Sequence, residues 1–268
     1  MTDSFQSRRF RTAAAHYLAG RPPYSPRLIQ RVIDLTSLTP AHGVLDLGCG
    51  PGMLTLAFAP FAREVLGVDP EPEMLRAAAA RQAPPNVRWM QASSNDLGPS
   101  FGRFFLTVMG RSFHWMDRAE TLRRLDALIE PGGAIALFGD DHPQVPDNAW
   151  RDRWRALIDG YAGDDPWRGR ERRATWIRHE AVLLDSAFSK LERISVIERR
   201  QVATETLIDR ALSMSSTSRA RLGERADAMV EEMRALLAEL APSGTVVEVL
   251  ATSALIARRP IGFDIETK

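Results

Sequence analysis

Short apolar runs alternate with amphipathic stretches along the first half of the chain. The runs are rich in Val, Leu, Ile and Phe, and they predict buried strands at 43–49, 64–69, 87–92, 104–110 and 134–140. Between them, the spacing of apolar residues predicts helices at 52–62, 72–82 and 117–130. Strands that alternate with helices indicate parallel crossover units, so we expect a doubly wound sheet with helices on both faces.

The alternation stops after Asp140, where a second pattern begins. Residues 141–190 show no strand pattern, and we expect helices there that form a cap rich in tryptophan, with Trp150, Trp154, Trp167 and Trp176. Two further strands are predicted at 191–204 and 245–259, with helices near 205–215 and 218–240 between them. The predicted fold class is therefore α/β, with a doubly wound, mostly parallel sheet of seven strands.

The chain of 268 residues is long enough for one elaborated domain. We expect four parts: an N-terminal helical cap at 1–40, a ligand-binding core at 41–140, a helical lid insert at 141–190 and the completion of the sheet at 191–268. No internal repeat or low-complexity linker divides the chain. The insert is therefore expected to pack on the sheet domain.

Composition and charge narrow the class of protein. The chain has 35 basic and 34 acidic side chains, and this balance does not favour binding to nucleic acid. No run approaches the roughly 20 apolar residues that span a membrane, and no secretory signal stands at the N-terminus. The single cysteine cannot form an internal disulfide. We therefore expect a cytoplasmic protein, a monomer or homodimer that binds no metal, and the many alanines and arginines suggest a bacterial source.

The candidate chemistry begins at the sequence VLDLGCGPGMLTLAF, residues 44–58, where a predicted strand leads into a predicted helix. Gly48, Gly50 and Gly52 form a G-x-G-x-G pattern, and Met53 stands where a dinucleotide fingerprint would need its third glycine. A P-loop is excluded because no Gly-Lys-Ser/Thr follows. A glycine turn at the carboxyl edge of a parallel sheet is typical of a nucleotide-like ligand. The alternative is a tight turn without a ligand.

An acidic residue ends the next predicted strand. Asp69 lies nineteen positions after Gly50, where a carboxylate can accept hydrogen bonds from both hydroxyls of a ribose. The same aspartate can also cap the helix that follows. Together with the glycine pattern, Asp69 favours a ligand that contains adenosine but no pyrophosphate.

At this point the sequence resembles the class I S-adenosylmethionine-dependent methyltransferases. VLDLGCGPG and VLGVDP are similar to their first two cofactor motifs, and later motifs follow in order at MQASSNDLG, FFLTVMGRSFHWMD and LIEPGGAIAL. The leader AHYLAGRPPYSPRLIQ is similar to the Tyr…Arg-Pro-x-Tyr leader of the small-molecule branch that includes trans-aconitate methyltransferase. The resemblance leaves residues 141–185 uncovered. It implies the Rossmann-like methyltransferase fold and S-adenosylmethionine as cofactor.

The resemblance also implies which residues bind the cofactor. Ser93 departs from the family pattern, because an acidic residue is common at that position, and Phe-Phe stands where Phe-Asp is customary at the start of the fourth strand. The implied cofactor-binding residues are Asp46, Gly48, Cys49, Gly50, Gly52, Asp69, Pro70, Met74, Ser93, Ser94, Gly110, Arg111 and Tyr24.

The acceptor side is expected beyond the fourth strand. A methyl group on a sulfonium needs little more than an aligned nucleophile, and a base helps where the acceptor must lose a proton. His114 is the candidate base, with a histidine bonded in the loop wall as the alternative. Arg111 can meet an acceptor carboxylate or lie on the surface, and the RGRERR run at 168–173 can anchor an anion or be a solvated loop. The candidate pocket residues are Phe113, Trp115, His142 and Trp150.

The sequence therefore predicts a methyltransferase that moves the methyl of S-adenosylmethionine to an O, N or C nucleophile of a small metabolite. One alternative is a protein that binds this cofactor without methylating, since cofactor motifs report only the cofactor site. A second alternative is a methyltransferase of nucleic acid or protein, which the near-zero net charge does not favour. A nicotinamide dehydrogenase is disfavoured by the misplaced third glycine.

Overall fold

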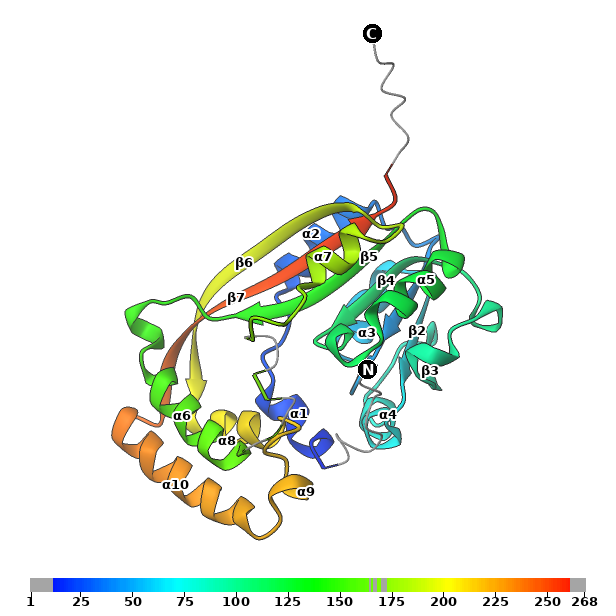
Figure 1. The fold of residues 1–268 in the computed structure, drawn as a ribbon. Coiled ribbons are helices and arrows are strands. Elements are labelled where there is room, and N and C mark those ends of the chain that lie inside the picture. The colour runs from blue at the N-terminus through cyan, green and yellow to red at the C-terminus, as the bar shows by residue number, and fades with distance from the viewer. Residues whose placement is uncertain (1–11, 164, 166–167, 170–172, 261–268) are drawn as a thin grey trace.

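A seven-stranded sheet forms the centre of the computed structural model, which describes residues 12–163, 165, 168–169 and 173–260. The strands lie in the order β3-β2-β1-β4-β5-β7-β6 (Figure 1). All neighbouring pairs are parallel except those of β7, which runs antiparallel to β5 and β6. The predicted α/β class and mostly parallel sheet are confirmed. The strands are β1 Gly43–Leu47, β2 Glu64–Asp69, β3 Val87–Gln91, β4 Phe104–Gly110, β5 Ile129–Asp141, β6 Lys190–Ala203 and β7 Thr245–Arg258.

Helices cover both faces of the sheet because its central strands are apolar on both sides. Along β1, Val44 belongs to the core on one face and Leu45 to the core on the other, as the two-residue period of a strand requires. Helices α2 and α3 contribute to the first core, and α5 and α7 contribute to the second. The helices are α1 Ala14–Gly20, α2 Pro26–Thr36, α3 Met53–Phe58, α4 Pro72–Ala79, α5 Arg118–Leu128, α6 Trp150–Ala162, α7 His179–Leu184, α8 Thr204–Leu212, α9 Arg219–Leu222 and α10 Arg225–Leu240.

Three predicted helices end earlier than the sequence pattern indicates, and the one predicted at 72–82 stops at Ala79. The helix predicted at 52–62 stops at Phe58, and a 3-10 turn that contains Pro60 follows it. The helix predicted at 117–130 stops at Leu128, because the chain enters β5 at Ile129. The Pro-Gly-Gly segment therefore lies inside a strand, where the register with β4 shifts.

A third core lies away from the parallel strands, in a helical subdomain that we define as α6, α8, α9 and α10. Trp154 and Ile158 of α6 pack there with Met229 of α10. Figure 1 shows these helices at the far end of β6 and β7, with α1 next to α8. The segment 141–190 is thus divided, since α6 joins this subdomain and Leu183 of α7 packs on the sheet. Trp167 and part of the RGRERR run lie outside the described residues.

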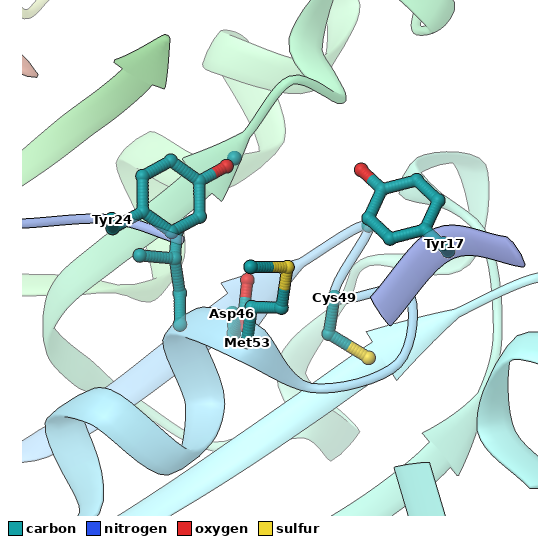
Figure 2. A pocket seen from close by; sticks show the side chains of 8 residues that line it. Tyr17, Tyr24, Asp46, Cys49 and Met53 are labelled. Carbon is teal, nitrogen blue, oxygen red and sulfur yellow. The ribbon is translucent and has the colours of Figure 1, made fainter. Parts of the chain in front are cut away.

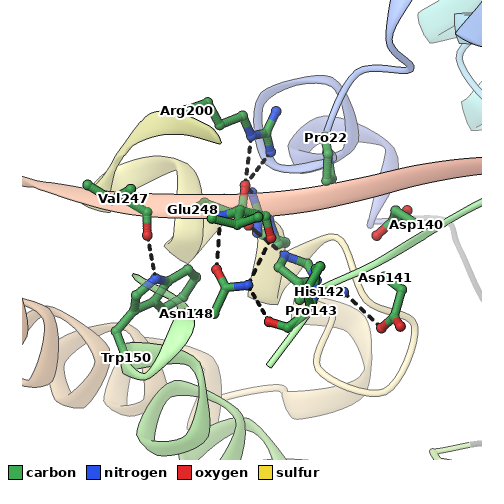
Figure 3. Close-up of polar contacts among 12 residues, drawn as sticks. Pro22, Asp140, Asp141, His142, Pro143, Asn148, Trp150, Arg200, Val247 and Glu248 are labelled. Atoms are coloured by element: carbon green, nitrogen blue, oxygen red, sulfur yellow. Dashed lines mark hydrogen bonds and ion pairs between the residues drawn. The ribbon is translucent and has the colours of Figure 1, made fainter. Parts of the chain in front are cut away.

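A buried carboxylate joins the helical subdomain to the sheet. Glu248 on β7 is 0% exposed, and its oxygens accept hydrogen bonds from Arg210 Nη1 of α8 (2.5 Å) and Arg200 Nε of β6 (2.7 Å). His142 Nε2, just after β5, lies 2.7 Å from Glu248 Oε1 (Figure 3). Arg210 Nε also donates to the carbonyl of Gly20 at the end of α1. These contacts hold the pKa of Glu248 below its usual range, even though burial opposes ionisation.

We expect Glu248→Gln to destabilise the protein by about 3–5 kcal/mol, because it leaves the buried Arg210 without its counter-charge. The melting temperature should fall by roughly 10 °C in a chain of this size. The matched control is Glu239→Gln, which removes a solvent-exposed partner of Arg153 and should have little effect. Equal melting temperatures for the two variants would contradict the role of Glu248.

The stability that Glu248 contributes should also depend on pH. Because the folded pKa of Glu248 is depressed, its contribution is present above about pH 4.5 and is lost as the pH falls further. The melting temperature of Glu248→Gln should therefore fall less steeply with acid than that of the wild type.

Candidate functional site

The glycine loop at the carboxyl end of β1 is built from left-handed backbone. Gly48, Gly50 and Gly52 have φ values of 71°, 54° and 78°, a region that other residues rarely adopt. A Cβ on Gly48 would lie 2.5 Å from Cβ of Ser112, and one on Gly52 would lie 2.3 Å from the Trp89 ring. Packing therefore requires glycine at these two positions. At Gly50 the space is open, with Met74 Sδ the nearest atom at 3.9 Å.

Asp46 lies beneath this loop and is almost completely buried. Its Oδ2 accepts hydrogen bonds from the backbone N–H (2.8 Å) and the hydroxyl (2.6 Å) of Thr55 at the start of α3. Oδ1 has no protein partner in the part of the chain that the structure describes. Burial raises the pKa of Asp46 to about 7, although the bonds from Thr55 oppose the shift.

Asp69 ends β2 on the other side of the loop. Its Oδ2 accepts from the N–H of Gly50 (2.8 Å), and its Oδ1 accepts from the N–H of Glu71 (2.9 Å). Burial raises the pKa of Asp69 to about 6. The residue at the N-cap of α4 is Glu71, two positions later than the sequence interpretation placed it. Asp69 thus fixes the glycine loop against the turn that precedes α4.

Asp46 lines a cavity at the carboxyl edge of the parallel strands. The space measures about 250 Å³, including the part open to solvent, and two tyrosines from the N-terminal segment stand over the glycine loop (Figure 2). The sequence leader contained Tyr17 without singling it out as a site residue, and periodicity assigned Met53 and Leu54 to a helix only. The lining residues are Tyr17, Tyr24, Asp46, Gly48, Cys49, Met53, Leu54 and Gly110.

Arg111 holds the second of these tyrosines in place. Its φ is 55°, and its guanidinium lies 4.5 Å from the centre of the Tyr24 ring. Nε donates to the Asp140 carboxylate, and Nη2 donates to the carbonyl of Pro22 (3.0 Å). The side chain is only 10% exposed, so the surface alternative for Arg111 is wrong. The desolvation cost of burying this cation is met by the ion pair with Asp140.

The predicted adenine side is assembled from two further turns. Met74 is a buried residue of α4 beside the glycine loop. Ser93 uses its N–H and its hydroxyl to bond the carboxylate of Asp96, in a capping box of a 3-10 turn, and Ser94 is buried within that turn. The hydrogen bonds from Ser93 lower the pKa of Asp96. Pro70 follows Asp69 directly and is half-buried.

The residues predicted for the acceptor pocket do not gather at this cavity. Phe113 is buried in the core beside α5 and α7, because the 3-10 turn of Phe113–Trp115 directs it inward. His114 and Trp115 contact each other, with ring centres 4.9 Å apart. His142 is engaged with Glu248. Trp150 is 9% exposed and donates from Nε1 to the carbonyl of Val247 (2.9 Å), so it belongs to the core of the helical subdomain (Figure 3).

Two kinds of feature are absent from the described residues. No group of three or more His, Cys, Asp and Glu side chains in those residues is placed to hold a metal ion. None of the helices within the same residues has the length and apolar character needed to cross a bilayer.

Comparison with known proteins supports the cofactor motifs. Residues 44–133 match a family model described as a methyltransferase domain, Methyltransf_25. An uncharacterised methyltransferase of Mycobacterium tuberculosis (strain H37Rv) is 25% identical over 219 residues, which cover 77% of this chain and 76% of that protein. A trans-aconitate 2-methyltransferase of Azoarcus sp. (strain BH72) is 38% identical over 131 residues, 47% of this chain and 45% of the relative.

The fold is shared with solved structures as well. A protein of Anaeromyxobacter dehalogenans, described as a candidate type II methyltransferase, has a TM-score of 0.63 at 23% identity, over 89% of this chain and 97% of that chain. This likeness shows the fold, and the family match covers the glycine loop, Asp69 and the strands that carry them. Residues 44–133 are therefore a methyltransferase domain of the S-adenosylmethionine-dependent type, and the cofactor is S-adenosylmethionine.

Proposed function

We propose that the protein transfers the methyl group of S-adenosylmethionine to an O, N or C nucleophile of a small metabolite. The observation that carries this proposal is the cavity that Tyr17 and Tyr24 close above the glycine loop, on the side of Asp46. A cavity that is walled by aromatic rings and set between the leader and the glycine loop suits a small acceptor better than a polymer. Relatives in Azoarcus sp. and Paracidovorax citrulli described as trans-aconitate 2-methyltransferases support a small-molecule acceptor.

The residues around the cavity fit the cofactor. Asp46 presents an oxygen without a protein partner, and we infer that it accepts hydrogen bonds from the cofactor's amino group. Asp69 carries acceptor lone pairs beside the N–H of Gly50, and it would hold the ribose hydroxyls. The open space at Gly50 allows the ligand to approach the backbone closely. When bound, the cofactor supplies an electrophilic methyl group on a positively charged sulfur.

The chain's own contribution to the transfer is alignment and exclusion of water. Tyr24 is clamped by Arg111 and stands so close to the end of β4 that a Cβ on Gly110 would lie 2.4 Å from its hydroxyl. Burial raises the pKa of Tyr24 well above its usual value, so this phenol stays neutral. A rigid neutral wall can orient an acceptor for in-line attack. The role of His114 as a base stays a prediction.

We expect Asp69→Asn to weaken binding of S-adenosylhomocysteine by tenfold or more, because the charged acceptor of the ribose hydroxyls is lost. Isothermal titration calorimetry measures the affinity, and Glu239→Gln, whose side chain is 64% exposed on α10, is the matched control. A folded Asp69→Asn variant with unchanged affinity would remove the ribose role. Mass spectrometry of incubations with S-adenosylmethionine and small metabolites then tests the transfer, which requires an acceptor that gains one methyl group.

Cofactor affinity should also depend on pH through Asp46. Its folded pKa is about 7, so below that pH the free protein carries a neutral carboxyl that must lose its proton before it can pair with the cofactor's ammonium group. We expect affinity for S-adenosylhomocysteine to fall by up to about tenfold per pH unit below pH 7. Calorimetry at several values between about pH 5.5 and 8.5 measures this slope.

The control for this pH dependence is Asp46→Asn, which cannot ionise. Its affinity should be weaker at neutral pH and should vary less with pH, with the residual slope coming from Asp69. An equal slope for the wild type and Asp46→Asn would show that Asp46 does not pair with the cofactor.

A further inference from the structure

Helix α1 supplies part of the cavity wall, because it carries Tyr17 (Figure 2). The helix has 7 residues, its N-cap Ala13 makes no side-chain hydrogen bond, and no acidic residue stands in its first turn. Isolated helices shorter than about 12 residues are marginally stable in water. The position of Tyr17 above the glycine loop therefore depends on the elements against which α1 packs.

The inner face of α1 follows the helical period. Its buried and half-buried residues include Ala13, His16, Tyr17 and Gly20, whereas Leu18 on the outer face is 42% exposed. Figure 1 shows that α1 lies next to α8, and α1 contacts α8 more extensively than it contacts α4. The inner face is thus turned mainly toward the helical subdomain, with Tyr17 at the border of the cavity.

The two ends of α1 are attached to the helical subdomain through the backbone. Before the helix, Thr12 Oγ1 accepts a hydrogen bond from the N–H of Ala220 in α9 (2.9 Å). At its other end, a Cβ on Gly20 would lie 2.3 Å from the backbone nitrogen of Arg210, so only glycine permits this approach of the two helices. Arg210 Nε also donates to the Gly20 carbonyl (3.0 Å).

Between these ends, a pair of side chains joins α1 to α8. His16 Nδ1 lies 2.7 Å from Oδ1 of Asp209, and the two side chains are 22% and 33% exposed. A pair with this much exposure contributes little to the free energy of unfolding. It does restrain the rotation of α1 about its own axis, because His16 is the point at which a side chain within the helix is bonded to α8.

The direction of His16 determines the direction of Tyr17. The two residues are adjacent, so their side chains leave the helix about 100° apart. When His16 is bonded to Asp209, Tyr17 therefore has a fixed direction, and it lines the cavity. The guanidinium of Arg21 lies 5.4 Å from the centre of the Tyr17 ring and further restrains it.

We propose that Asp209 is a positioning residue for cofactor binding: by holding His16, it keeps the Tyr17 ring over the bound S-adenosylmethionine. Asp209 is not among the residues that line the cavity, so it acts through α1. The helical subdomain thus contributes to the affinity for the cofactor, although its own core lies away from the parallel strands. This inference rests on the proposed function for the place of the cofactor in the cavity.

The test is a double-mutant cycle of Asp209→Ala and Tyr17→Ala. Isothermal titration calorimetry measures the affinity of each variant for S-adenosylhomocysteine, and thermal unfolding is followed separately by circular dichroism. The matched control is Glu205→Ala. Glu205 is a carboxylate on the same helix, but it is 66% exposed and pairs with Arg234 of α10, within the helical subdomain.

We expect Asp209→Ala and Tyr17→Ala each to weaken binding of S-adenosylhomocysteine about three- to tenfold. In the Tyr17→Ala background, Asp209→Ala should weaken binding less than about twofold, because the ring that Asp209 positions is absent. Asp209→Asn should keep most of the wild-type affinity, since an amide can still form a hydrogen bond with His16.

The control variant and the melting temperatures separate this role from a structural one. Glu205→Ala should bind S-adenosylhomocysteine as tightly as the wild type does. The melting temperature of Asp209→Ala should stay within about 3 °C of the wild type, because the lost pair is partly exposed to solvent.

Two results would overturn the proposal while leaving the cofactor site intact. One is an affinity of Asp209→Ala equal to that of the wild type. The other is a pair of losses that multiply in the double variant, which would show that Asp209 does not act through Tyr17. Failure of the wild type to bind S-adenosylhomocysteine would instead contradict the proposed function, and this inference would fall with it.

Discussion

The cost of burying a charge determines how the helical subdomain packs against the sheet. Glu248 lies near the start of β7 with no exposed surface, and the helical subdomain and the edge of the sheet each supply an arginine to it. Arg210 of α8 adds its hydrogen bond to those that Arg200 and His142 make from the sheet side. The position of α8, and through the Gly20 carbonyl the position of the leader, therefore follows from one electrostatic requirement.

Much of the fold was predictable because its signals are local. All seven strands were predicted from apolar runs, and the signal is strongest in β1 and β2, which are buried on both faces and nearly continuous in apolar residues. The glycine loop could also be predicted from the sequence, because the left-handed backbone at Gly48, Gly50 and Gly52 leaves few alternatives to glycine. The helix ends at Phe58 and Leu128 were missed, since each depends on a competing local structure that periodicity does not report.

The acceptor side was harder to predict because its contacts join residues distant in sequence. Trp150 is an aromatic residue of the kind that lines ligand pockets, yet its indole donates a hydrogen bond to the Val247 carbonyl, ninety-seven positions away. Arg111 and Asp140 are twenty-nine positions apart and meet only when β4 and β5 pair. No spacing rule connects Glu248 with His142 or Arg210, so the network could be found only in the folded chain.

The distribution of charge at the glycine loop is consistent with a cationic ligand. Two buried carboxylates stand there, Asp46 and Asp69, and burial has raised the pKa values of both. The charge of Asp69 also raises the pKa of Asp46, so the two carboxylates disfavour each other's ionised form. A ligand of the opposite sign stabilises such a pair. The glycine loop therefore favours a donor that carries positive charge, as the sulfonium and ammonium groups of S-adenosylmethionine do.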